Sequence, residues 1–84
     1  MEKCIFCNLD QKRIISTSNF FHVIRDSFPV SYLHTLIIPK RHAETYFDLD
    51  EDETGELSKV LKIERQKILE IDDTVKAFNI GINA

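Results

Sequence analysis

Two cysteines stand close to the start of the chain. Cys4 and Cys7, in the stretch CIFC, are the only cysteines in the sequence, with two residues between them. At this spacing two thiolates can bind one tetrahedral zinc ion. The same spacing occurs in redox-active dithiols, although those usually stand where a strand runs into a helix. A disulfide and two buried, unreactive thiols are the remaining interpretations, so the pair favours a metal without excluding the others.

A four-coordinate zinc site needs two more ligands, and the histidines are candidates. They are His22, His34 and His42. His22 stands inside an apolar run and is typical of a strand residue with one solvent-facing edge. His34 and His42 flank opposite ends of the run TLIIP, so we do not expect them to share a site. Of the two we favour His42 as the third ligand, because Pro39 ends the run and lets the chain turn.

Asp26 is the other side chain that could contact a ligand. It stands three residues before Pro29. An aspartate in such a place either shapes a turn through its side chain or accepts a hydrogen bond from a ligand hydroxyl, and the residues alone favour the turn. The two glycines, Gly55 and Gly81, stand alone, so no glycine-rich phosphate loop is present.

The composition excludes several classes of protein. With 84 residues, 43% of them hydrophobic and 30% charged, the chain has the composition of one small globular domain. The net charge of −3 gives no general attraction for nucleic acid. No apolar run approaches the ~20 residues of a membrane span, and the charged start does not resemble a signal peptide. We therefore expect a cytoplasmic protein that does not cross a membrane.

Three apolar runs predict an antiparallel sheet. RIIST and FFHVIRD are rich in β-branched and aromatic residues, and the pair Ser18-Asn19 between them favours a turn, so we expect a hairpin. HTLIIP is a continuous apolar run that Pro39 closes. A run without polar alternation is typical of a strand that is covered on both faces, so we expect this strand to be central.

Residues 50–72 predict a single amphipathic helix. Asp50 followed by Glu53 resembles a capping box, in which each side chain accepts from the other residue's backbone N–H. A stripe of apolar residues at helical spacing gives the helix one buried face. The stripe consists of Leu57, Val60, Leu61, Ile68 and Ile71.

Three residues of this helix do not fit a single buried face. Glu64 falls in the middle of the apolar stripe, whereas Ile63 and Leu69 lie off it. A helix that is covered on two sides, by its own sheet and by a second subunit, would explain both observations. We therefore hypothesise that a second subunit covers the outer side of this helix.

The last run, KAFNIGINA, alternates between apolar and small or polar residues. Phe78, Ile80 and Ile82 point one way, and the other side carries small residues and amides. The alternation predicts a half-exposed strand, whose polar face could receive a ligand.

Together these stretches resemble the histidine-triad family of nucleotide hydrolases and transferases. The resemblance rests on CIFC, on VIRDSFPVSYLHTLIIPKRH, on an acidic helix start after FDLDEDE and on FNIGIN. It implies an α+β domain with an antiparallel sheet and one main helix, usually paired into a homodimer. It also implies a purine nucleotide or dinucleotide ligand, and attack by a histidine on the α-phosphorus to give a nucleotidyl-histidine.

The resemblance assigns expected roles to individual residues. Asp26 resembles the carboxylate that receives the ribose hydroxyls, and Ile24 resembles part of the apolar wall for the base. His34 is similar to the histidine that supports the nucleophile, and Asn83 to the amide near the phosphate. In relatives that begin with C-x-x-C, structural zinc is bound by both cysteines, the histidine after a Pro-Lys pair and one ligand further on. That pattern matches Cys4, Cys7 and His42.

The chain also departs from the family pattern. The His-x-His-x-His signature would lie beyond Asn83, so the nucleophile and the strand that carries it are not among these residues. We therefore expect residues 1–84 to be the N-terminal two-thirds of one such domain, incomplete without the downstream strand and without turnover alone. The alternative is a non-catalytic module that binds a nucleotide or zinc. Leu33 also stands where relatives commonly have glycine, which affects the loop before His34.

Overall fold

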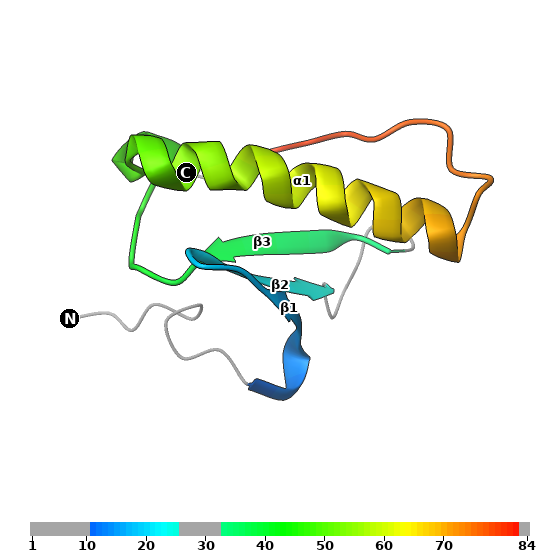
Figure 1. The fold of residues 1–84 in the computed structure, drawn as a ribbon, viewed down its shortest axis with the longest axis horizontal. Coiled ribbons are helices and arrows are strands. Elements are labelled where there is room, and N and C mark those ends of the chain that lie inside the picture. Colours follow the sequence, from blue (N-terminus) through cyan, green and yellow to red (C-terminus); the bar gives the residue numbers. More distant parts are fainter. Residues whose placement is uncertain (1–10, 26–32, 83–84) are drawn as a thin grey trace. The chain divides into compact units, whose positions relative to one another are not determined.

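The computed structural model describes residues 11–25 and 33–82 of the chain. The chain forms two compact units, residues 1–42 and 43–84. The first unit holds an antiparallel sheet and the second holds one long helix (Figure 1). The α+β class expected from the sequence is therefore confirmed. No helix in the described ranges has the length and hydrophobicity needed to cross a membrane.

The first unit begins with a short 3-10 helix, η1 (Gln11–Arg13), and the predicted hairpin follows it. Strands β1 (Ile14–Thr17) and β2 (Phe21–Arg25) pair antiparallel. The turn between them is closed by the backbone N–H of Ser18, which donates to the carbonyl of Phe21 at 2.9 Å. The register shifts between Ile14 and Ser16, which leaves one extra residue in β1.

Strand β3 (Thr35–Pro39) pairs antiparallel with the other side of β2. The strand order is β1-β2-β3, so β2 is central and β3 lies at an edge of the sheet that the described residues form. The expectation of a central third strand is wrong for this sheet. The physical reason is pairing, because β2 is the one described strand that pairs with β3, which is accordingly mostly half-buried, whereas β2 carries the fully buried residues Phe21, Val23 and Ile24. An apolar run indicates burial, but it does not say how many strands flank it.

The second unit begins with a 3-10 turn, η2 (Tyr46–Asp48), and continues into helix α1 (Glu51–Ile71). Asp50 caps the helix: the backbone N–H of Glu53 donates to Asp50 Oδ1 at 2.8 Å, and the N–H of Asp50 donates to Glu53 Oε1 at 2.9 Å. The predicted helix and its capping box are thus confirmed. The helix has 21 residues, which corresponds to a length of roughly 31 Å.

One stripe of α1 is buried, as the helical spacing predicted. It includes Val60 and Ile68, with Glu64 between them at 4% exposure. Ile63 lies off the stripe and is 53% exposed. Ile71, which the pattern placed on the stripe, is instead 55% exposed and is the last residue of the helix.

The expected strand near the end of the chain is absent from the described residues. Residues 75–82 form neither helix nor strand, and in Figure 1 they follow α1 as an orange-to-red trace. Phe78, Ile80 and Ile82 are 38%, 67% and 60% exposed. An alternating run becomes a strand only when a neighbouring strand accepts its backbone hydrogen bonds. The described sheet contains β1 to β3 alone, so alternation was not sufficient here.

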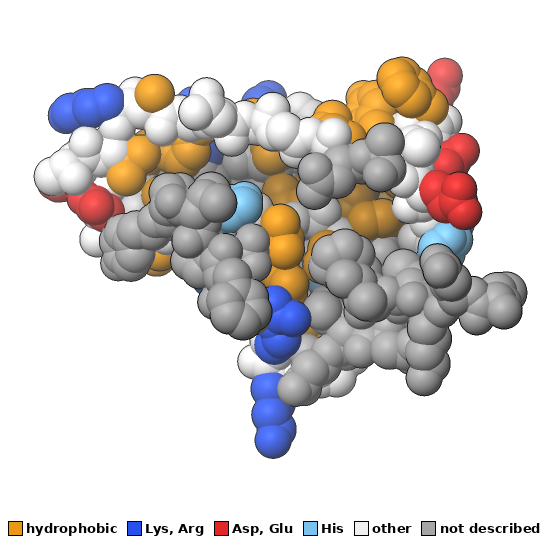
Figure 2. Space-filling model, turned by 180° about the vertical axis from the view of Figure 1, so that it is seen from behind, with side chains coloured by type: hydrophobic (Ala, Val, Ile, Leu, Met, Phe, Trp, Pro, Cys, Tyr) orange, Lys and Arg blue, Asp and Glu red, His pale blue; other side chains and the backbone are white. Residues whose placement is uncertain are grey.

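Other large apolar side chains also reach the surface of the described residues. Phe47 in η2 is 90% exposed, and its ring meets that of Tyr46 edge-on, with centroids 5.7 Å apart. On the face that Figure 2 draws, hydrophobic side chains in orange remain visible beside acidic side chains in red. Isolated exposed apolar residues are common in globular proteins, so these side chains do not by themselves define a site.

Candidate functional site

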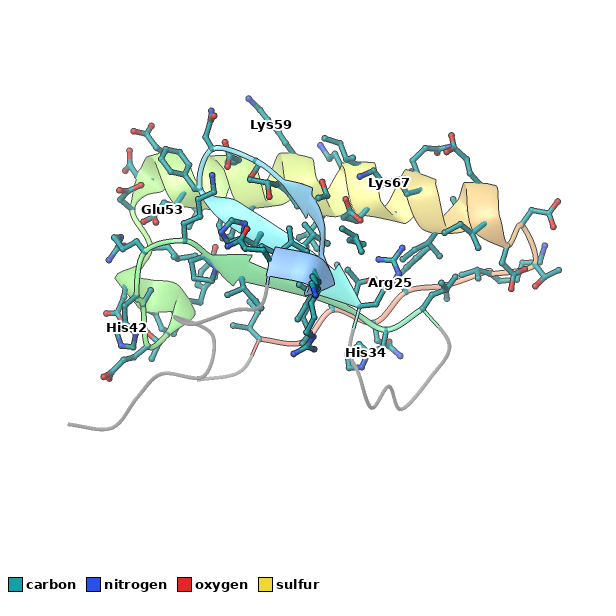
Figure 3. All side chains as sticks on the ribbon, turned by 90° about the horizontal axis from the view of Figure 1, so that it is seen from below. Arg25, His34, His42, Glu53, Lys59 and Lys67 are labelled. Carbon is teal, nitrogen blue, oxygen red and sulfur yellow. The ribbon has the colours of Figure 1, made fainter. Side chains whose placement is uncertain are left out.

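The candidate site lies where the ladder between β2 and β3 ends. Arg25 and Thr35 are the last cross-strand pair, and Ile24 pairs with Leu36 directly beside them. His34 immediately precedes β3 and so stands at this same end of the sheet. Figure 3 shows the labelled side chains of Arg25 and His34 close to this end, and His42 at the opposite end of the strand. The structure thus brings two predicted site residues, Ile24 and His34, into one neighbourhood.

A chain of two hydrogen bonds connects the strands here. Arg25 Nη1 donates to Thr35 Oγ1 at 2.9 Å, and Thr35 Oγ1 donates to the carbonyl oxygen of Leu33 at 2.8 Å. A guanidinium has only donors and a carbonyl only accepts, so the direction of both bonds is fixed by chemistry. The single proton of the Thr35 hydroxyl therefore points at Leu33.

Leu33 has a left-handed backbone. Its φ is 66°, and it is the one non-glycine residue with positive φ in the described parts of the chain. A side chain in this region brings Cβ close to the backbone, which costs about 1–2 kcal/mol. Relatives were expected to carry glycine at this position, and glycine adopts the conformation without that cost. Leucine in place of glycine at position 33 therefore adds a conformational cost to the backbone just before His34.

His34 and Ile24 differ in solvent exposure. His34 is half-buried, with Nδ1 shielded from solvent. Ile24 is fully buried at 0% exposure, so it packs inside the sheet. Leu36, its half-buried partner on β3, points to the same face because directly paired residues share a face. Leu36 thus extends the apolar surface next to Ile24 toward His34.

His42 stands apart from these residues. It is exposed and follows β3 at its other end, close to where the backbone N–H of Lys40 donates to the carbonyl of Phe20 at 2.8 Å. The separation of His34 and His42 by the length of β3 agrees with the sequence-based expectation. In the described ranges, no group of three or more potential metal ligands lies together.

Four predicted site residues lie outside the described residues. They are Cys4, Cys7, Asp26 and Asn83. The expected ribose, phosphate and zinc contacts of these four side chains therefore stay predictions. The structure describes Arg25 on β2, which precedes Asp26 in the sequence, and the start of β3.

His22 has a structural role in this sheet. It is half-buried near the start of β2, and its Nδ1 lies 3.1 Å from Oγ1 of Thr17, its cross-strand partner on β1. This bond lies toward the hairpin end of the sheet, and the candidate site lies at the other end. The prediction that His22 is a strand residue with a solvent-facing edge is confirmed.

Sequence reasoning did not identify Arg25 and Thr35. Both lie within the stretch VIRDSFPVSYLHTLIIPKRH, but the resemblance assigns no role to either, and their bond joins residues ten positions apart. The predicted strands carried one usable signal: if VIRD and HTLII pair antiparallel, a cation on one strand can face a hydroxyl on the other. Only the register makes that pairing specific.

The chain is similar to one family of known proteins. The family model described as the HIT domain matches residues 8–83, a range that includes most of both units. An uncharacterized HIT-like protein of Saccharolobus solfataricus is 31% identical over 88 residues, covering 96% of this chain and 63% of the relative. An uncharacterized HIT-like protein of Mycoplasma genitalium is 38% identical over 77 residues, covering 87% of this chain and 52% of the relative.

A third relative shows the same partial coverage. An uncharacterized HIT-like protein of Chlamydia muridarum is 37% identical over 62 residues, covering 74% of this chain and 48% of the relative. The chain thus spans about half to under two thirds of the length of these curated relatives. No solved structure matches it significantly.

Proposed function

Since this chain belongs to the HIT domain family, we propose that it forms the nucleotide-binding part of a histidine-triad hydrolase or nucleotidyltransferase. The ligand is a purine nucleotide or dinucleotide, and the substrates of the complete domain are dinucleoside polyphosphates or nucleoside phosphoramidates. The observation that carries the proposal is that half-buried Leu36, the cross-strand partner of buried Ile24, extends the apolar surface toward His34 at one end of the sheet. An apolar base needs hydrophobic surface, and a phosphate needs polar donors such as imidazole beside that surface.

In the proposed mechanism an imidazole nitrogen attacks the α-phosphorus, and the leaving group departs with the electrons of its bond to phosphorus. Water or another acceptor then displaces the histidine, so one difficult displacement is divided into two easier ones. The nucleophilic histidine is not among these 84 residues, whose histidines are His22, His34 and His42 with no His-x-His pair. His34 acts as the supporting histidine in this scheme.

The remaining roles follow the family resemblance. The Asp26 carboxylate accepts hydrogen bonds from the ribose hydroxyls, and the Asn83 amide contacts the phosphate. Cys4, Cys7 and His42 hold a structural zinc ion together with a ligand from outside these residues. Two thiolates and an imidazole form a donor set that suits zinc, and His42 is an exposed residue. We further propose a homodimer that works in the cytoplasm.

A second candidate is a non-catalytic module that binds a nucleotide or zinc. The observation in its favour is that half-buried His34 and the apolar surface of Leu36 lie together, and these two side chains can bind a nucleotide without a chemical step. The two candidates differ in turnover and agree on binding.

AMP binding to the 84-residue chain tests the shared part of both candidates. We expect AMP to bind in isothermal titration calorimetry, and both Asp26→Ala and His34→Ala to weaken binding at least about tenfold, the loss expected for a hydrogen bond to a charged group. His22→Ala is the matched control, because His22 is a histidine of the same sheet outside the site. Equal loss in all three variants, or no binding by the wild type, contradicts the proposal.

Turnover separates the two candidates. We expect the 84-residue chain to bind AMP without hydrolysing adenosine phosphoramidate, and a chain extended by a HIT-type His-x-His-x-His segment to hydrolyse it. If the extended chain binds AMP but remains inactive, the non-catalytic module is favoured.

A further inference from the structure

We propose that Arg25 and Thr35 are positioning residues, which fix the backbone at Leu33 and thereby hold the imidazole of His34 at the end of the sheet. The importance of this for nucleotide binding rests on the function proposed above. The structural part of the inference stands on two hydrogen bonds, one from Arg25 to the Thr35 hydroxyl and one from that hydroxyl to the Leu33 carbonyl.

The first step concerns the Thr35 hydroxyl. It accepts from Arg25 Nη1 at 2.9 Å and donates its only proton to the carbonyl of Leu33 at 2.8 Å. Without Arg25, the hydroxyl could rotate toward water or toward another acceptor. The guanidinium thus orients the hydroxyl, and bonds in such a chain polarise and strengthen each other.

The second step concerns Leu33, the residue that receives the bond. Its φ of 66° lies in a region that a leucine occupies only when its surroundings hold it there. The Thr35 bond to the Leu33 carbonyl is a contact that opposes relaxation of this peptide. Relaxation would take φ from a positive to a negative value, a change of more than about 100°.

His34 lies in the chain between Leu33 and Thr35, the two residues that this hydrogen bond joins. A change of that size at Leu33 reorients the chain that enters His34, while Thr35 remains anchored in the ladder by its pairing with Arg25. The imidazole would then leave its half-buried position, in which Nδ1 is shielded from solvent. The position of His34 is therefore coupled to a bond that its own side chain does not make.

The sheet itself does not depend on this bond. Strands β2 and β3 are paired over five positions, from Phe21 with Pro39 to Arg25 with Thr35. Loss of one side-chain bond at the last pair leaves the other pairs in place. We therefore expect a local effect on Leu33 and His34 rather than the loss of the sheet.

The test is Thr35→Val, which keeps the shape of the side chain and removes the hydroxyl. We expect the imidazole NMR signals of His34 and the amide signal of Leu33 to shift in this variant. AMP affinity should fall about tenfold, because a displaced His34 would lose its hydrogen bond to the charged phosphate. Thr35→Ser restores the hydroxyl and should return the His34 signals and the affinity to within about twofold of the wild type.

Thr17→Val is the matched control. It removes a threonine hydroxyl that also lies on this sheet and meets a histidine, Nδ1 of His22, at 3.1 Å. We expect it to leave the His34 signals and AMP binding unchanged. Arg25→Met provides a second variant, which keeps the Thr35 hydroxyl but removes its donor, and it should shift the same His34 signals.

The NMR signals of His34 decide whether Arg25 and Thr35 position its imidazole. Unchanged His34 signals in Thr35→Val overturn the inference. The inference is also overturned if the His34 signals of Thr35→Ser differ from those of the wild type as much as those of Thr35→Val do. If Thr35→Val does not fold, Arg25→Met is read by the same criteria. If the wild type does not bind AMP, the proposed function fails, but the His34 signals still test the positioning role independently.

Discussion

Thr74 donates two hydrogen bonds to one oxygen of Asp72, from its hydroxyl at 2.6 Å and from its backbone N–H at 3.0 Å. Asp72 also caps the end of α1, and its own N–H donates to the carbonyl of Ile68 at 2.9 Å. A carboxylate at the C-terminal end of a helix opposes the helix dipole. The two bonds from Thr74 offset that repulsion within a tight turn.

The first prediction concerns the pH dependence of this turn. The Thr74 hydroxyl, followed by its backbone N–H, lowers the pKa of Asp72 below its ordinary value. A lowered pKa means that the charged form stabilises the fold above the unfolded-state pKa of about 4, and that this contribution is lost as the pH falls below it. In Thr74→Val we expect the pKa to rise toward its ordinary value, as measured by NMR titration of the Asp72 carboxyl carbon.

Thr54→Val is the control for this titration, because the Thr54 hydroxyl donates to the carbonyl of Glu51 and not to Asp72. It should leave the Asp72 titration unchanged. An identical Asp72 pKa in the wild type and Thr74→Val would contradict the prediction.

The second prediction concerns Gly55, which lies inside α1. A Cβ added there meets no atom within 4 Å. Alanine at a helical position without steric conflict is more favourable than glycine by about 1 kcal/mol. We therefore expect Gly55→Ala to increase the free energy of unfolding by about that amount in urea denaturation followed by circular dichroism.

Gly81→Ala is the matched control. Gly81 also has open space for an added methyl group but lies outside the helix, so we expect a change of only a few tenths of a kcal/mol. Equal effects of the two substitutions would show that helix propensity is not the cause.

The third prediction concerns the left-handed backbone at Leu33. Leu33→Gly removes the Cβ conflict at a φ of 66°, a gain that the greater chain entropy of glycine and the loss of the half-buried side chain partly offset. We expect the free energy of unfolding to stay equal or to rise by up to about 1 kcal/mol. Leu36→Gly, in β3, should instead lower it by at least about 2 kcal/mol. Destabilisation of similar size in both variants would refute the prediction.

The fourth prediction concerns the proposed zinc site. Chain purified from zinc-containing medium should hold zinc in elemental analysis, and Cys7→Ser or His42→Ala should lower its zinc content substantially. His22→Ala should not, because His22 lies in β2 with its Nδ1 at the Thr17 hydroxyl. A wild-type chain without zinc, or equal zinc content in all variants, argues against these ligands.

The fifth prediction concerns the proposed homodimer. Ile63 lies off the buried stripe of α1 and is 53% exposed, as expected for a residue that a second subunit covers. Ile63→Lys should shift the sedimentation of the chain from dimer to monomer, because a lysine there would be desolvated in the interface. Gln66→Lys adds the same charge at another exposed position of α1 and serves as the control. A monomeric wild type at micromolar concentration contradicts the dimer.

The features that the sequence predicted correctly depend on neighbouring residues. The turn at Ser18-Asn19 and the reciprocal caps of Asp50 and Glu53 each need only a few adjacent positions. The capping bonds at Thr45 and Asp48 are local in the same way. Their Thr-x-x-Asp spacing resembles a capping box and was a signal that could have been used.

The features that the sequence did not predict depend on distant residues. The edge position of β3 follows from which strands are present to pair with it, and the bond between Arg25 and Thr35 follows from the register. The same reason explains residues 75–82, where alternation alone did not produce a strand. At the candidate site, His34 was predicted as a site residue from the family pattern. The hydrogen bonds from Arg25 to Thr35 and from Thr35 to Leu33 could be identified only from the fold.

The two consecutive caps before α1 bear on the order of folding. Thr45 with Asp48, and then Asp50 with Glu53, satisfy the backbone donors of two successive turns through side chains at most three residues away. Helix nucleation is the slow and unfavourable step of helix formation, whereas elongation takes nanoseconds per residue. The start of α1 is thus specified by contacts that close within one turn of chain. This segment can therefore nucleate without a contact from any residue of the sheet.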